Sequence, residues 1–361
     1  MNKNIIDKKI QAFDSLAKIF SAVANNQLNS LDKNLVPLAN ELNKTVDKIH
    51  DFNPWFIQPF VKYQLNALAD SITPKNIELW LKPYYNKLIS YNNQKTVAII
   101  MAGNIPLVDF HDIVAAVFAN HKILLKPSSK DSQLPKITVK ILTSLLPEYS
   151  ELFTFADDIL KNYSYDAVIA TGSDNSARYF NYYFRNIPHI IRKNRTSVAV
   201  IHGNESQQDL EKLADDVFLH FGLGCRNVSK IFIPKNFDLN RLFKAFFKYK
   251  FVIDNHKYAN NYTYNKAIYL LNKEKFFDNG FVMLKPDDTR IVSPTAVVFY
   301  QEYLHLNSVH KFLQPFAEKI QCIVSNQPVP NLSTIPLGTS QKPMLWDYPD
   351  NIDTMNFLLS L

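Results

Sequence analysis

Between residues 96 and 233 the chain alternates short, almost wholly apolar runs with longer amphipathic ones. Apolar runs at 96–101 and 122–126 flank a helical segment at 109–119, which is the pattern of a βαβ unit. Helical patterns at 132–146 and 173–184, and extended runs near 152–156, 166–170, 189–191 and 197–201, continue this alternation. Because strands that alternate with helices pair in parallel, we expect an α/β fold with a doubly wound parallel sheet.

The segments around this core have other patterns. Residues 1–92 carry apolar residues at helical spacing, interrupted by prolines, and we expect them to be helical. After the core, Ser206 and Asp209 form a capping-box pattern that opens a helix, which we expect to end at Gly222 before a strand at 228–233. Beyond residue 328 the chain is rich in proline.

Composition excludes several classes of protein. Apolar residues make up 47% and charged residues 20% of the chain, which indicates a soluble globular protein. No apolar run approaches the roughly 20 residues that a membrane span needs, and no signal peptide is visible, so we expect a cytoplasmic protein. The two cysteines, Cys225 and Cys322, lack zinc-site spacing, and no metal is expected. The net charge of +7 is spread along the chain, which argues against nucleic-acid binding.

Polar residues follow three of the predicted strands at their carboxyl ends, where open α/β sheets bind ligands. Gly103 and Asn104 follow the first strand, Lys126 ends the second, and Gly172 and Ser173 precede a helix after another. The side chain of Asn104 could donate to an oxyanion, and the helix start after Ser173 could hold an anion. Each segment alone is more typical of an ordinary turn or surface residue, but three at one sheet edge are harder to explain in this way and favour a binding site.

Cys225 lies in the short turn between the predicted helix and strand. A cysteine without context is more often a small buried residue than a nucleophile. Here it follows Gly222 and Gly224 and precedes Arg226, whose charge could lower a thiol pKa. These neighbours favour a presented thiol. His220 could act as its base, but we expect it to be a charge at the helix end. Cys322 has the pattern of a buried strand residue.

The order of these motifs resembles the aldehyde dehydrogenase superfamily, and within it the LuxC-type acyl-CoA reductases. The similarity extends from about Lys95 to the C-terminus. It rests on these runs: Ala-Ile-Ile-Met-Ala-Gly-Asn-Ile-Pro, Ile-Leu-Leu-Lys-Pro-Ser-Ser, Ala-Thr-Gly-Ser, Gly-Leu-Gly-Cys-Arg-Asn-Val-Ser-Lys and the C-terminal Trp-Asp-Tyr-Pro-Asp-Asn-Ile-Asp-Thr-Met.

The resemblance implies a role for each of these positions. Cys225 would be the nucleophile that accepts the acyl group, and Asn104 with the Cys225 N–H would form an oxyanion hole. Lys126 would contact the adenosine ribose or its 2′-phosphate. The other implied cofactor-binding positions are Gly103 and, at the pyrophosphate, Gly172 and Ser173.

The activity implied is NADPH-dependent reduction of a fatty acyl-CoA to an aldehyde, with NADH left open as the cofactor and coenzyme A as part of the substrate. An acyl phosphate or an acyl-protein thioester as donor, and a non-catalytic acyl-CoA-binding relative, are the alternatives. Acyl-transfer partner proteins and a homo-oligomer are also left open. The aromatic residues of the N-terminal region could line the acyl tunnel, although core packing is the favoured role for most of them.

The implied organisation has four parts. Residues 1–92 would pack as helices on a Rossmann-like cofactor-binding domain at 93–203. A catalytic thiol domain would cover 204–327, and a tail at 328–361 would return to the domain interface.

Two departures from the superfamily pattern concern the chemistry. Where hydrolytic aldehyde dehydrogenases carry a general-base glutamate, this chain has Arg-Lys-Asn-Arg-Thr at 192–196. The absence of that carboxylate favours reduction over hydrolysis. The glutamate that often holds the nicotinamide ribose is replaced near Arg290.

In contrast to these departures, Gly338 resembles the superfamily's late glycine turn near the substrate tunnel.

Overall fold

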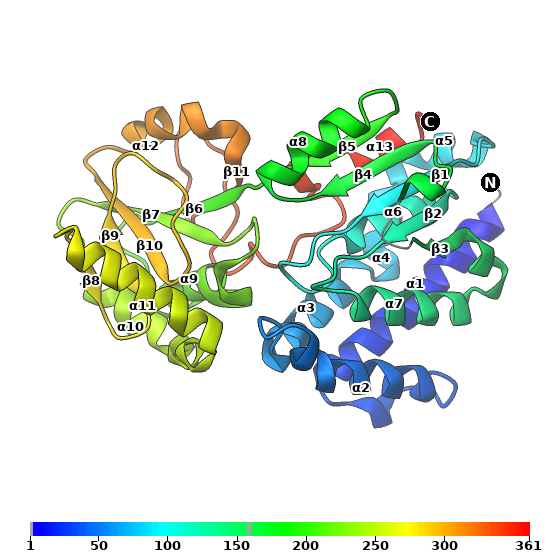
Figure 1. Ribbon diagram of the computed structural model, residues 1–361, viewed down its shortest axis with the longest axis horizontal. Coiled ribbons are helices and arrows are strands. Elements are labelled where there is room, and N and C mark those ends of the chain that lie inside the picture. Colours follow the sequence, from blue (N-terminus) through cyan, green and yellow to red (C-terminus); the bar gives the residue numbers. More distant parts are fainter. Residues whose placement is uncertain (1–2, 157–159) are drawn as a thin grey trace. The chain divides into compact units, whose positions relative to one another are not determined.

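The computed structural model describes residues 3–156 and 160–361. The chain divides into two compact units: residues up to Asn194 with Lys342–Leu361, and Arg195–Gln341. Each unit contains one β-sheet covered by helices, as Figure 1 shows. The predicted α/β architecture, with a parallel sheet in one unit and a second α/β unit, is confirmed.

The first unit is built on a five-stranded, wholly parallel sheet in the order β3-β2-β1-β4-β5. Its strands are β1 (Thr96–Ile100), β2 (Lys122–Lys126), β3 (Phe153–Phe155), β4 (Ala167–Thr171) and β5 (His189–Arg192). Its helices are α1 (Lys3–Ala24), α2 (Val36–Phe52), α3 (Gln58–Ser71), α4 (Pro74–Leu81), α5 (Tyr85–Ser90), α6 (Phe110–Phe118), α7 (Gln133–Leu145), α8 (Asp174–Tyr183) and α13 (Thr354–Leu358). Short helical turns are η1 (Leu28–Ser30), η2 (Lys82–Tyr84), η3 (Pro147–Leu152), η4 (Leu160–Asn162) and η8 (Pro349–Asn351).

Both faces of this sheet are buried, which explains why its strands are apolar throughout. In β1, Val97 and Ile99 belong to the core beneath α1, α6 and α7, whereas Ala98 and Ile100 belong to the core beneath α8. Figure 1 shows α8 on one side of the sheet and α1 and α7 on the other. The alternation follows from the two-residue period of a strand.

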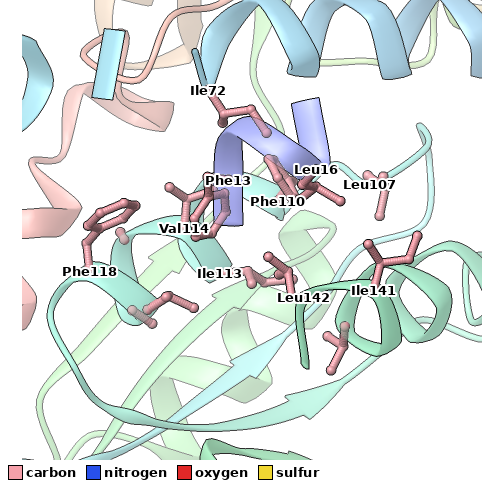
Figure 2. Packing of buried hydrophobic residues seen from close by; sticks show 14 of the residues in the cluster. Phe13, Leu16, Ile72, Leu107, Phe110, Ile113, Val114, Phe118, Ile141 and Leu142 are labelled. Carbon is pink, nitrogen blue, oxygen red and sulfur yellow. The ribbon is translucent and has the colours of Figure 1, made fainter. Parts of the chain in front are cut away.

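The N-terminal helices extend the larger of these cores. Phe13 and Leu16 of α1 pack among Phe110 and Val114 of α6 (Figure 2). Trp80 is also buried in this cluster, where its indole N–H donates to the hydroxyl of Tyr348 at 2.7 Å. The aromatic residues of this region, for most of which core packing is the favoured role, include Trp55, Phe56, Phe60 and Trp80. Phe56 and Trp80 are core residues, Phe60 is buried, and Trp55 packs against the core.

The second unit contains a mixed six-stranded sheet in the order β11-β6-β7-β10-β9-β8, antiparallel only between β8 and β9. Its strands are β6 (Thr196–Val200), β7 (Val228–Pro234), β8 (Phe277–Asp278), β9 (Met283–Pro286), β10 (Val297–Tyr303) and β11 (Ile320–Val324). Its helices are α9 (Gln207–Phe218), α10 (Asn240–Phe246), α11 (His256–Leu271) and α12 (Leu306–Leu313), with turns η5 (Leu219–Gly222), η6 (Phe247–Asp254) and η7 (Gln314–Lys319).

The position of β6 differs from the sequence-based expectation. The run at 197–201 was expected in the first sheet, within a domain at 93–203. Instead β6 lies between β7 and β11 of the second sheet, and the two units divide after Asn194. The partner β11 is more than a hundred residues away in sequence, so local pattern could not assign the strand to its sheet. The tail is also divided, because residues 328–341 belong to the second unit and 342–361 to the first.

Candidate active site

The first unit brings the predicted cofactor-binding segments to one edge of its sheet. Strands β2 and β4 both flank β1 in parallel, with Ile100 paired to Lys126 on one side and to Ala170 on the other. The segments after β1, β2 and β4 therefore emerge at the same carboxyl edge. The strand order reverses between β1 and β4, and ligands bind open α/β sheets at such a switch point.

Close packing at this edge accounts for Gly103. A β-carbon on Gly103 would lie 2.7 Å from Oγ of Ser128 and 2.8 Å from Cβ of Lys130. A side chain at position 103 would therefore push apart the segments that follow β1 and β2. The packing places the turn that carries Asn104 directly against the loop that follows Lys126.

Two buried carboxylates hold the segment 101–109, here called the Asn104 turn. Near its start, the amide of Ala102 donates to Oδ2 of Asp109 at 2.7 Å. Further along, the amide of Leu107 donates to Oδ2 of Asp131 at 2.8 Å. Leu107 has a φ of +52°, which is costly for a branched side chain, but it is buried in the core of the unit (Figure 2). The carboxylates and the core together fix this turn.

Asp109 also links the ends of two strands. Its Oδ1 accepts a 2.5 Å hydrogen bond from the hydroxyl of Thr171, the last residue of β4. Burial and the nearby Asp112 carboxylate raise the pKa of Asp109. For Asp131, burial raises the pKa to about 7. Both carboxyl groups at this edge therefore hold a proton more tightly than an exposed aspartate does.

Arg192, the first residue of the segment at 192–196 that was expected to lack a general base, has a structural role. Its guanidinium is buried and donates to both oxygens of Asp112, and its NH2 group also donates to the Thr354 hydroxyl at 3.0 Å. Although burial alone would raise the pKa of Asp112, the Arg192 charge lowers it. This ion pair joins the end of β5 to α6 and to the returning C-terminal segment.

The Gly172–Ser173 segment forms the start of α8, as the sequence predicts. Ser173 is the N-cap residue, and its Oγ accepts from the Ser176 amide at 3.2 Å. A β-carbon on Gly172 would lie 2.9 Å from Cβ of Ser176, so glycine permits this tight entry to the helix. The N-terminal amides of α8 thus lie beside the switch point, with the chemistry that a pyrophosphate requires.

Cys225 lies in the second unit, in a turn whose backbone is unusual. Residues 219–227, here called the Cys225 turn, connect the end of α9 to β7. His220, Phe221 and Gly222 have φ values of +53°, +58° and +74°, so the chain turns left-handed for three residues. The sequence indicated the break at Gly222, but it does not show that a histidine and a phenylalanine share this conformation. The reversal ends α9 and leads the chain back to β7.

His220 is not the helix-end charge that the sequence suggested. It is buried, and burial lowers the pKa of its imidazole to about 3. A neutral ring at physiological pH cannot compensate the helix dipole, so that expectation is wrong. The sequence pattern could not reveal this burial.

A buried amide joins the Cys225 turn to the helix before it. Oδ1 of Asn227 accepts from the Gly224 amide at 2.8 Å. Its Nδ2 donates to the carbonyls of Asp216 at 3.1 Å and Leu219 at 2.9 Å. Asn227 therefore satisfies carbonyls at the end of α9 while holding the residue immediately before Cys225.

Ser197 holds the other side of Cys225. Its hydroxyl donates to the Cys225 carbonyl at 3.1 Å and lies 3.1 Å from Sγ of Cys322 in β11. Burial raises the pKa of the Cys322 thiol, although the charge of Arg226 acts in the opposite direction. The charge of Arg226, which follows Cys225 in the sequence, thus favours the ionised form of the Cys322 thiol.

The late glycine turn is anchored on the same helix. The carboxylate of Asp216 accepts from the amide of Gly338 at 2.6 Å and from the amide and hydroxyl of Ser340 at 3.0 and 2.7 Å. Gly338 has a φ of +82°, and a β-carbon there would lie 2.8 Å from Cβ of Lys212 in α9. The end of α9 thus organises both the Cys225 turn and the Gly338 turn.

The sequence pattern alone does not identify the polar residues that hold the two turns. Asp109, Asp131, Ser197 and Asn227 all lie at or next to the start of a predicted helix or strand, where polar residues are ordinarily solvated. In the structure they are buried, with 5% or less of each residue exposed, and therefore are not ordinary solvated polar residues. For Asn227, proximity to the suspected nucleophile was the one available signal.

Several solved structures share the fold of this chain. Aldehyde dehydrogenase 21 from Physcomitrella patens, solved with succinate, matches with a TM-score of 0.63 at 11% identity, over 99% of this chain and 87% of that one. An acetylating aldehyde dehydrogenase from Geobacillus thermoglucosidasius matches with 0.57 at 9% identity, over 94% and 87%. Indole-3-acetaldehyde dehydrogenase AldA of P. syringae, solved with NAD⁺, matches with 0.56 at 12% identity, over 93% and 77%. The fold is that of the aldehyde dehydrogenases.

A family model described as acyl-CoA reductase (LuxC) matches residues 61–242, just over half of the chain. The chain belongs to the acyl-CoA reductase (LuxC) family and is an enzyme of the aldehyde-forming oxidoreductase class. No curated protein sequence matches it. In the part of the chain that the structure describes, no helix is long and apolar enough to cross a membrane.

Proposed function

We propose that this enzyme reduces a fatty acyl-CoA to the aldehyde through an acyl group bound to Cys225, with NADPH as the cofactor. The observation that carries the proposal is the Cys225 turn. A partly exposed cysteine is held there by side-chain hydrogen bonds on both sides, in a chain of the acyl-CoA reductase family. A cysteine that served only as a small core residue would not need such a turn.

The first half of the reaction transfers the acyl group. The Cys225 thiolate attacks the thioester carbonyl carbon, and a new carbon–sulfur bond forms. Charge develops on the carbonyl oxygen, and we assign its stabilisation to the Asn104 amide and the Cys225 N–H. Collapse breaks the original carbon–sulfur bond, and coenzyme A leaves as a thiolate that takes a proton from solvent.

The second half reduces the enzyme-bound thioester. The nicotinamide cofactor, when bound, supplies the hydride that converts this thioester to a thiohemiacetal. Loss of the hydroxyl proton and cleavage of the bond to Cys225 then release the aldehyde and restore the thiolate. The residues at 192–196 include no carboxylate that could activate water, and Arg192 is committed to Asp112. This supports reduction of the acyl-enzyme over its hydrolysis.

The sheet edge of the first unit supplies the proposed cofactor contacts. Lys126 at the end of β2 would contact the adenosine ribose or its 2′-phosphate, and the start of α8 at Gly172 and Ser173 would face the pyrophosphate. Gly103 keeps the Asn104 turn packed against the loop after Lys126. In this assignment the first unit binds the cofactor and the second carries the thiol.

Cofactor oxidation with defined acyl donors tests the proposal. NADPH and NADH are each supplied with acyl-CoAs of graded chain length, with an acyl phosphate and with an acyl-protein thioester. We expect oxidation with long-chain acyl-CoA, faster with NADPH, and its loss in Cys225→Ala while Cys322→Ala stays active. Activity only with another donor would reassign the substrate. An inactive wild type, or an active Cys225→Ala, would contradict the proposal.

A further inference from the structure

Side-chain hydrogen bonds hold the backbone on both sides of Cys225. On the N-terminal side the amide of Gly224 donates to Asn227, and on the C-terminal side the carbonyl of Cys225 accepts from Ser197. The backbone of Cys225 lies between these two fixed points. The directions of its own N–H and of its Cα–Cβ bond are therefore fixed.

Asn227 can hold its side because its whole amide is engaged. It is 2% exposed, its oxygen is bonded to Gly224, and its nitrogen is bonded to carbonyls of α9 and η5. Rotation of the amide would place donors and acceptors opposite their like and leave buried groups unsatisfied. Aspartate would keep the acceptor but lose the donors, and alanine would lose both.

Ser197 holds the other side through a directed pair of hydrogen bonds. It lies on β6 and is fully buried, and its Oγ accepts from the Cys322 amide at 3.2 Å. Because burial raises the pKa of Cys322, that residue remains a thiol and can donate to the same oxygen. The Ser197 hydroxyl hydrogen is then directed to the Cys225 carbonyl.

We propose that Asn227 and Ser197 are positioning residues that preset the Cys225 thiol and N–H for attack on the acyl carbonyl. The proposal rests on the proposed function, in which Cys225 is the nucleophile. A fixed nucleophile and a fixed oxyanion donor lower the barrier because no reorganisation is needed when charge develops. Neither side chain is assigned a contact with the substrate.

The alternative is a purely structural role, in which Asn227 caps the end of α9 and Ser197 joins two strands. The two roles predict different kinetics. A structural residue affects the fraction of folded enzyme and its stability. A positioning residue lowers kcat of the folded enzyme and leaves KM for the acyl donor nearly unchanged.

The test compares Asn227→Ala and Ser197→Ala with Leu242→Ala, which removes a buried side chain of α10, outside residues 219–227. Per folded enzyme, we expect kcat to fall about 100-fold in Asn227→Ala. In Ser197→Ala it should fall on the order of 10-fold. Ser197→Thr, which keeps the hydroxyl, should recover most of the loss. Hydrogen exchange of the 219–228 amides should increase in Asn227→Ala and not in Leu242→Ala.

The outcomes separate this inference from the function on which it rests. Wild-type activity together with wild-type kcat in Asn227→Ala and Ser197→Ala would overturn the positioning role and leave the proposed function standing. Losses equal to that of Leu242→Ala would also overturn it. A wild type inactive with every acyl donor would instead contradict the proposed function.

Discussion

The Asn104 turn and the Cys225 turn are both held in place by buried polar side chains, but the side chains differ in kind. Each follows a secondary-structure element, and each includes left-handed residues that are not glycine, Leu107 in one and His220 and Phe221 in the other. The Asn104 turn is held by two buried carboxylates. The Cys225 turn is held by a neutral amide and a neutral hydroxyl.

This difference between carboxylates and neutral groups follows from the side chain that each turn carries, an amide in the Asn104 turn and a thiol in the Cys225 turn. A carboxylate near a cysteine raises the thiol pKa and removes the thiolate that reacts. The side-chain amide of Asn104 does not ionise, so nearby carboxylates do not change its protonation state. Carboxylates are therefore tolerated around it, although their burial costs free energy. The first region is therefore expected to respond to charge and pH, and the second to the geometry of its neutral hydrogen bonds.

The largest expected effect is a loss of stability when the buried ion pair between Arg192 and Asp112, in the first unit, is broken. In Arg192→Leu, the buried Asp112 loses its partner, and the free energy of unfolding should fall by about 3–5 kcal/mol. Urea denaturation at neutral pH measures this change. The double variant with Asp112→Asn should recover more than half of the loss. A cost below about 1 kcal/mol for Arg192→Leu would show that the region does not depend on this ion pair.

The next effect moves a charge into the neutral region. Asn227→Asp places a carboxyl group one hydrogen bond from Gly224, and the ionised form of that group should raise the Cys225 thiol pKa by about one unit or more. Alkylation of Cys225 by iodoacetamide at pH 7, followed on its peptide by mass spectrometry, should slow on the order of 10-fold. Asn240→Asp, the same substitution in α10, is the control. Equal pH profiles for the two variants would contradict the distinction between the turns.

A smaller effect removes an ionisable carboxyl group, that of Asp131, from the first region. Because the pKa of Asp131 is raised to about 7, the folded state keeps its proton while the unfolded state ionises. Its contribution to stability is therefore complete below about pH 4 and is lost as the pH rises towards 7. In Asp131→Asn this decline should be absent, so unfolding curves should diverge from wild type between these pH values. The exposed Asp51→Asn is the control, and parallel curves for wild type and Asp131→Asn would refute the effect.

The smallest effect concerns His220. Since burial lowers its pKa to about 3, it does not titrate between pH 5 and 8. His220→Asn retains a residue type that tolerates the left-handed conformation, and it should leave the pH profile of Cys225 alkylation unchanged. A shifted profile would identify His220 as a base for Cys225 and would contradict a neutral imidazole at this position.

The fold could be predicted largely because its signals are local. The apolar run of β2 and the capping box of α9 lie where the sequence places them. The error at β6 has a non-local cause, because its run is equally apolar in either sheet and its assignment depends on pairing with β11. Local pattern carries no information about that choice.

For the candidate site, the sequence predicts where the turns lie but not which side chains hold them. Glycines and strand ends indicated the turns at Gly103, Gly172 and Cys225, because backbone freedom is visible in a sequence. The groups that hold these turns, such as Asp131 and Asn227, resemble ordinary polar turn residues until their burial is known. For the same reason His220 was expected to be charged.

The central claim is that Cys225 carries the acyl group, and intact-protein mass spectrometry tests it most directly. The enzyme is incubated with a long-chain acyl-CoA and no nicotinamide cofactor, so the acyl-enzyme cannot be reduced. We predict a mass increase of one acyl group in wild type and in Cys322→Ala, and none in Cys225→Ala. An acyl group retained by Cys225→Ala, or its absence from a wild type that reduces the same acyl-CoA, would contradict the account.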